Sequence, residues 1–109
     1  MATIALNIGS TDKAYNLETE EGFIVPVPYV VITSINIMLR DGVYHIDYNY
    51  DIYKSSEEKD KSRVNSNLDI TTNFKMTPHD FLSDSILELC YDDIVKQIPV
   101  AEKIDDGIK

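Results

Sequence analysis

The chain has 109 residues, of which 43% are hydrophobic, and nineteen acidic side chains against ten basic ones give a formal net charge of −9. A chain of this length forms one domain with its own core, and its lone cysteine, Cys90, excludes an internal disulfide. The acidic balance argues against direct nucleic-acid binding, because Lys and Arg supply the affinity for phosphates. The sequence contains no basic leader and no apolar run of membrane-spanning length, so we expect a protein made in the cytoplasm without a signal peptide or membrane contact.

Residues 1–28 are expected to form a short N-terminal strand followed by an arm. Apolar side chains alternate from Ile4 to Ile8, whereas residues 9–22 are polar and framed by glycines. Pro26 and Pro28 cannot both sit in a central strand, because each lacks a ladder donor. An extended entry into the next strand is therefore predicted. Whether the arm folds back or extends onto a neighbouring molecule stays open.

Residues 29–54 are predicted to form one long antiparallel hairpin. Its turn is Asp41-Gly42, since a type I′ turn needs positive φ at both central residues. A two-residue turn places Arg40 opposite Val43 and fixes the register of the other pairs. On the apolar face these pairs are Leu39–Tyr44, Ile37–Ile46, Ile35–Tyr48, Thr33–Tyr50 and Val31–Ile52; on the polar face they are Met38–His45, Asn36–Asp47, Ser34–Asn49 and Ile32–Asp51.

The second half of the chain predicts a strand over residues 67–76 and one helix over residues 78–98. Thr77 is a suitable N-cap with Pro78 in the first helical position, and Pro99 ends the helix. Residues 99–109 are expected to be a tail. The expected fold class is therefore α+β, an antiparallel sheet packed on one C-terminal helix within a single domain 1–109.

Candidate interaction residues come mainly from the predicted helix. Acidic side chains recur every fourth residue and would form a ridge, either solvated or available to a basic partner. The apolar residues of the helix cover a wider arc than one sheet face needs, so part of them would pack on the arm, on the tail or on another subunit. The residues expected to contact other proteins are Asp80, Asp84, Glu88, Asp92, Leu87 and Tyr91 on the helix, with Phe23 and Val25 on the arm.

Catalytic, cofactor and metal motifs were sought and none is predicted. Asp47, Asn49, Asp51 and Glu58 match four positions of a calcium loop, but the glycine that its sharp turn needs is replaced by Ile52. The two histidines have no second ligand at zinc spacing. The context of Cys90 is typical of a buried thiol, and we expect no enzymatic activity.

The stretches "YVVITSINI", "VYHIDYNYDIYKS" and "FLSDSILELCYDDIVKQIPVAEKIDD" resemble small virion and tail proteins of tailed bacteriophages. The resemblance spans about residues 29–106, with Tyr91, Val95-Lys96 and Pro99 at the matching places of the helix. It implies a non-enzymatic structural protein of a virion, in contact with copies of itself and with other virion proteins. The alternative is an acidic inhibitor whose carboxylates imitate the phosphates of a nucleic acid.

Overall fold

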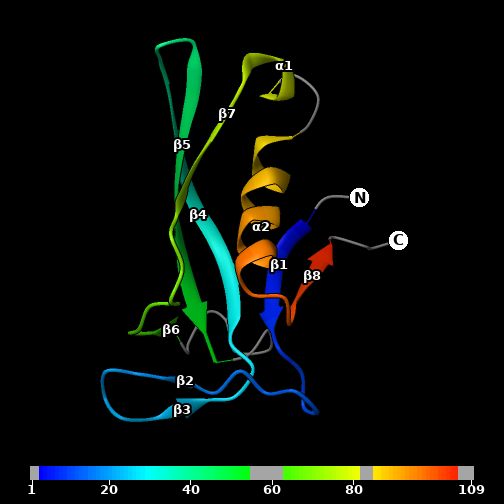
Figure 1. Cartoon of the computed structure of the whole chain (residues 1–109). Helices are drawn as coiled ribbons and strands as arrows, with labels where there is room; N and C mark the ends of the chain where they lie inside the picture. The colour runs from blue at the N-terminus through cyan, green and yellow to red at the C-terminus, as the bar shows by residue number, and fades with distance from the viewer. Residues whose placement is uncertain (1–2, 55–62, 82–84, 106–109) are drawn as a thin grey trace.

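An antiparallel sheet with a helix against one face forms the body of the molecule (Figure 1). The computed structural model describes residues 3–54, 63–81 and 85–105. The strands lie in the order β6-β5-β4-β1-β8, and β7 also pairs with β5. The α+β plan is confirmed. Its strands are β1 (Thr3–Ile8), β4 (Tyr29–Arg40), β5 (Val43–Tyr53), β6 (Arg63–Val64), β7 (Asn73–Met76) and β8 (Ala101–Asp105).

The β4–β5 hairpin has the predicted turn and, over most of its length, the predicted register. Asp41 and Gly42 both have positive φ, at 55° and 75°, as a type I′ turn requires. The predicted pairs are observed from Arg40–Val43 to Ser34–Asn49. A β-bulge between Ile32 and Ser34 then shifts the register, so the strands pair as Ile32–Tyr50, Val31–Asp51 and Val30–Ile52. The predicted pairs Thr33–Tyr50, Val31–Ile52 and Ile32–Asp51 are therefore wrong.

The bulge has a packing reason. A single extra residue in a strand reverses the faces of all side chains beyond it. The shift lets Val30 and Ile32 join the core together with Ile46 and Tyr48 on the neighbouring strand. Without the shift, Val30 and Ile32 would point to the polar face of the hairpin.

The C-terminal segment is a strand rather than a tail. β8 pairs antiparallel with β1, from Ile8–Ala101 to Thr3–Asp105. No clear hydrophobic period marks this segment, because β8 is a short edge strand whose partner lies almost a hundred residues earlier. β1 itself is confirmed, although a second bulge between Thr3 and Ala5 leaves Ile4 43% exposed instead of on the buried side.

The predicted single helix 78–98 is wrong, since the described residues form two helices, α1 (Pro78–Phe81) and α2 (Ile86–Gln97), and Ser85 before α2 is not helical. Thr77 caps α1 as expected, accepting the N–H of Asp80 at 3.3 Å. Ser85 has an extended backbone, with φ −66° and ψ 131°, and precedes α2. The separate first turn lets Phe81 stack on Tyr44, with 4.2 Å between the ring centroids. Residues 82–84 lie outside the described part of the chain.

The N-terminal arm folds back onto the body. Its ribbon consists of β2 (Leu17–Glu18) and β3 (Ile24–Val25), which lie at the end of the molecule opposite the hairpin turn (Figure 1). The N–H of Glu20 donates to the carbonyl of Asn65 at 3.1 Å. The predicted strand 67–76 is shortened to β7, because residues 67–72 follow the edge of β5 without forming a regular ladder.

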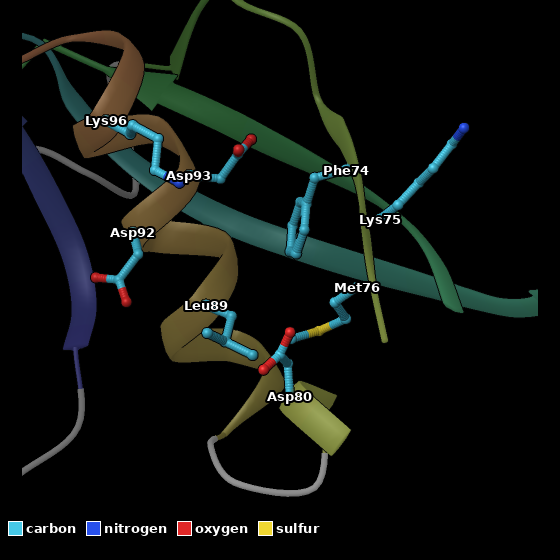
Figure 2. A pocket seen from close by; sticks show the side chains of 8 residues that line it. All are labelled: Phe74, Lys75, Met76, Asp80, Leu89, Asp92, Asp93 and Lys96. Carbon is cyan, nitrogen blue, oxygen red and sulfur yellow. The ribbon is translucent and has the colours of Figure 1, made fainter. Parts of the chain in front are cut away.

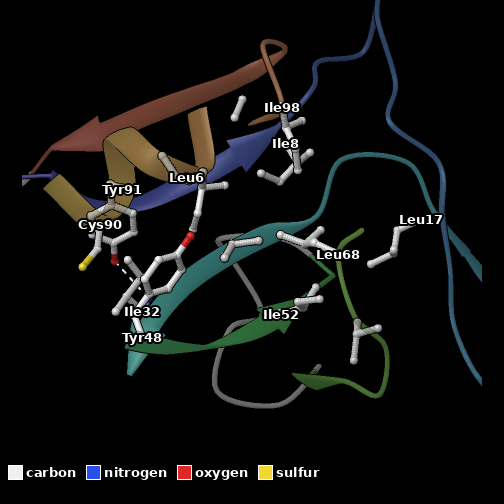
Figure 3. Close-up of a cluster of buried hydrophobic side chains, with 14 of the residues drawn as sticks. Leu6, Ile8, Leu17, Ile32, Tyr48, Ile52, Leu68, Cys90, Tyr91 and Ile98 are labelled. Carbon is white, nitrogen blue, oxygen red and sulfur yellow. Dashed lines mark hydrogen bonds between the residues drawn. The ribbon is translucent and has the colours of Figure 1, made fainter. Parts of the chain in front are cut away.

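The core lies between the sheet and α2 (Figure 3). Ile46 and Tyr48 are buried as predicted, at 0% and 1% exposed. α2 contributes Cys90, Tyr91 and Ile94 and contacts β1, β4 and β8. The wide apolar arc of the helix is thus accounted for in part by strands on both sides of it.

Candidate functional site

The hydroxyl of Tyr91 lies where β1 and β4 separate. The two strands pair at Leu6–Val30 and Asn7–Tyr29. The N–H of Ile8 donates to the carbonyl of Pro28 at 2.9 Å, so the next hydrogen-bonded pair after Leu6–Val30 would join Ile4 and Ile32. Instead, the Tyr91 hydroxyl donates a hydrogen bond to the carbonyl of Ile4 at 2.9 Å. It also accepts one from the N–H of Ile32 at 3.0 Å (Figure 3). Burial raises the pKa of this phenol. The Tyr91 hydroxyl therefore takes the place of a direct hydrogen bond between the two backbones and separates β1 from β4 at this point.

Beyond this point the outer edge of β4 has no strand beside it. Among residues 3–54, 63–81 and 85–105, β1 is the only strand that pairs with this edge, and its pairing ends at Val30. The N–H of Tyr48 on β5 donates to Thr72 at 3.0 Å, so Tyr48 and Ile35 form a non-hydrogen-bonded pair. By alternation, Ile35, Ile37 and Leu39 turn their backbone N–H and C=O groups away from β5.

The same segment carries exposed apolar side chains. Ile37, Met38 and Leu39 are 43%, 53% and 59% exposed. We call residues Ser34–Arg40 the open edge of β4. Unpaired backbone groups together with exposed apolar side chains are the combination that promotes pairing with another strand.

A second exposed apolar group lies on the β2–β3 ribbon. Phe23 and Ile24 are 64% and 56% exposed, and they line a shallow cavity of about 200 Å³ with Val25, Pro26 and Lys54. This group and the open edge of β4 lie toward opposite ends of a molecule 43 Å long (Figure 1). Apolar groups gathered in this way typically mark contacts with other proteins.

The predicted acidic ridge is not a continuous row of free carboxylates. Glu88 accepts hydrogen bonds from the backbone N–H of Thr3 at 3.1 Å and from its hydroxyl at 2.6 Å. Lys103 on β8 contacts Glu88 at 2.7 Å and also pairs with Asp92. The Lys103 and Thr3 hydrogen bonds lower the pKa of Glu88 from 4.5 to about 2. These two acids thus join α2 to β1 and β8.

A cavity of about 500 Å³ lies between β7 and α2 (Figure 2). The Phe74 ring reaches toward the helix there, and Met76 and Leu89 also line the cavity. Asp93 at its wall accepts a hydrogen bond from the Tyr48 hydroxyl at 2.7 Å and another from the Gln97 amide at 3.1 Å. Burial, followed by the bond to Asp93, raises the pKa of Tyr48.

This cavity is organised by structural contacts. The Gln97 amide also binds both backbone groups of Thr71, at 3.0 and 2.9 Å, and thereby fastens the segment before β7 to α2. The carboxylate of Asp93 therefore takes part in the hydrogen bonds that join Tyr48 and Gln97 at the edge of the core. These contacts explain its position without a ligand.

Nucleophilic and metal-binding groups were examined in the same way. Cys90 is fully buried, and burial raises the pKa of its thiol to about 12, so the thiolate is scarce at neutral pH. Within the described ranges, no three His, Cys, Asp or Glu side chains lie close enough to hold a metal ion. None of the described helices has the length and apolar character needed to cross a membrane.

The residues predicted to contact other proteins are dispersed. Phe23 is exposed, whereas Val25 and Tyr91 are 3% and 1% exposed and point into the core. Leu87 is partly buried against the same core, and Asp80 lies on α1, where it contacts its cap Thr77. Asp84, like Glu58 of the calcium template, lies outside the described residues. The interpretation of Val25 and Tyr91 as surface contacts does not agree with their burial.

The open edge of β4 was missed by sequence reasoning. Ile37 and Leu39 were assigned to a face covered by the helix, because alternation alone does not show how far the cover extends. The predicted length of the helix was misleading, because a helix over residues 78–98 would have spanned about 30 Å. α2 has twelve residues, about 18 Å at 1.5 Å per residue, whereas β4 also has twelve residues but spans about 40 Å.

Comparisons with protein-family models, with curated proteins and with solved structures found no match.

Proposed function

We propose that this chain is a non-enzymatic assembly protein that binds copies of itself and a larger partner. The observation that supports the proposal is that five of the seven exposed large apolar side chains in the described residues lie in two groups, on the open edge of β4 and on the β2–β3 ribbon. Two separate groups suit two separate contacts. A virion or tail of a bacteriophage is the setting that we propose, and it rests on the sequence resemblance.

The acidic inhibitor receives less support from the geometry. A phosphate mimic needs a row of carboxylates that face solvent and are free to meet cations. Glu88 and Asp92 instead contact Lys103 of the same chain, and Asp80 belongs to a different helix. The net charge of −9 is the feature that remains in favour of this alternative.

The mass of the full chain in solution tests the self-association. Light scattering from about ten to several hundred micromolar should give masses above the 12.4 kDa of a monomer. Removing residues 1–20 is not a suitable test, because it deletes β1 from the middle of the sheet. A strictly monomeric chain over this range would contradict the proposal.

The contact with a larger partner needs a second measurement. A tagged chain recovered from its native source should retain a stoichiometric partner that Phe23→Ser loses. Val100→Ser is the matched control, because Val100 is also an exposed apolar residue, at 38%, but belongs to the turn before β8 and not to the ribbon. Equal recovery of the partner by both variants would exclude the ribbon as the contact.

A further inference from the structure

We propose that two copies of this chain pair through the open edge of β4, antiparallel and symmetric about Ile37, so that their sheets become one. This inference rests on the proposed function, since it names the surface of self-association.

The backbone supplies the hydrogen bonds for this pairing. Ile35, Ile37 and Leu39 already turn their N–H and C=O groups outward. A two-fold axis at Ile37 places Ile37 opposite its own copy and Ile35 opposite Leu39 of the second copy. Each of these is a hydrogen-bonded pair in which two bonds are exchanged, about six bonds in all. An axis at another residue does not pair all three outward-facing residues with one another. With the axis at Met38, for example, Ile35 would lie opposite Asp41 in the turn.

The side chains agree with the same axis. Ile35, Ile37 and Leu39 lie on one face of β4, so each copy adds three apolar side chains to a continuous stripe on the joined sheet. On the other face, Asn36 meets Met38 and Ser34 meets Arg40. On the face of Ile35, Ile37 and Leu39, the antiparallel pairing therefore sets no polar side chain among the apolar ones.

The charges favour a second copy over an oppositely charged partner. Arg40 is the single charged residue among Ser34–Arg40. A basic partner for this acidic chain would find no carboxylate on this segment. In the symmetric pair, the two Arg40 residues lie six residues apart along the strands, about 20 Å, which exceeds the screening length at physiological salt.

The structure also explains why this edge is available. The outer edge of β5 is occupied by β7, and the lower part of β4 is occupied by β1. Tyr91 separates β1 from β4 at Ile32, which leaves the segment beyond it uncovered among the described residues. An isologous dimer formed here has one copy of the same segment on each side.

Paired substitutions test the contact. Ile37→Glu sets two carboxylates opposite each other on the axis, and the dimer dissociation constant should rise at least about tenfold. Met38→Glu is the matched control. It adds the same charge one residue away at a similarly exposed position, but meets Asn36 and should change the constant less than about threefold. Circular dichroism should show both variants folded, and equal constants for the two would overturn the inference.

Disulfide formation tests the register. Ile37→Cys should form an intermolecular disulfide on mild oxidation, because hydrogen-bonded pairs place Cα atoms about 5.5 Å apart. Arg40→Cys should remain reduced, and the wild-type chain is the control for the buried Cys90. Linkage through Arg40→Cys but not through Ile37→Cys would overturn the register.

The outcomes separate this inference from the proposed function. The wild-type chain can associate while Ile37→Glu and Met38→Glu give equal dissociation constants and Ile37→Cys forms no intermolecular disulfide. That result contradicts the pairing through the open edge of β4 but not the self-association. A wild-type chain that stays monomeric contradicts both.

Discussion

The two strands of the β4–β5 hairpin share the same alternation of apolar and polar residues, but their apolar side chains differ in burial. On β5, Ile46 and Tyr48 are 0% and 1% exposed, whereas their partners on β4 are Ile37, which is 43% exposed, and Ile35, which is partly buried. β7 covers the outer edge of β5 from Tyr44 to Asp47, and no described strand covers β4 beyond the bulge. The comparison teaches that apolar alternation marks a face able to be buried, while the neighbouring strand decides whether burial occurs.

The largest expected effect distinguishes the two partners of one pair. Ile46→Ala should lower the free energy of unfolding by about 2–5 kcal/mol, because it removes buried methyl groups and leaves a cavity. Ile37→Ala, directly opposite, should lower it by less than about 1 kcal/mol, since its side chain is half solvated. Urea denaturation at low protein concentration measures both. Similar losses would mean that β4 is covered as well as β5.

The next effect concerns the residue that separates β1 from β4. Tyr91→Phe keeps the ring but leaves the N–H of Ile32 and the carbonyl of Ile4 without their partner. The free energy of unfolding should fall by about 1–3 kcal/mol. Tyr44→Phe, on a half-buried ring near the turn, is the control and should change it by less than about 0.5 kcal/mol. A neutral Tyr91→Phe would indicate that the two strands do not need this hydroxyl.

The smallest effect is electrostatic and depends on pH. Glu88 holds β1 and β8 against α2, away from the open edge, and its pKa is lowered from 4.5 to about 2 by Lys103 and Thr3. Because the folded chain binds this proton less readily than the unfolded chain, the stabilisation is complete above about pH 5 and is lost as pH falls toward 2. Partial exposure limits it to about 1 kcal/mol.

Denaturation of Glu88→Gln and of the wild type at several pH values measures this contribution of Glu88 to the free energy of unfolding. The difference in unfolding free energy should be largest near pH 6 and shrink on acidification. Glu102→Gln, which removes an exposed carboxylate from the same strand as Lys103, is the control for the loss of one negative charge. A constant difference between pH 6 and pH 3 would assign the effect of Glu88 to packing rather than to charge.

Parts of the candidate site were accessible to sequence reasoning and parts were not. The Asp41-Gly42 turn and the register near it follow from local chemistry, as does the burial of Cys90. Phe23 is exposed, and its contact with another protein stays a prediction. Tyr91 was expected at an interface because its apolar neighbours seemed too numerous, but β1 and β8 flank the helix and account for its burial.

The amino-acid sequence by itself determined the elements whose causes lie within a few residues: the turn, the alternation of the strands near it, the cap at Thr77 and the helix end before Pro99. The tertiary structure alone decided the bulge at Thr33, the pairing of β8 with β1 and the open edge of β4. Each of these depends on groups that are distant in sequence. A hydroxyl on α2 takes the place of a contact between strands that lie 59 and 87 residues away from it, and no local pattern encodes that distance.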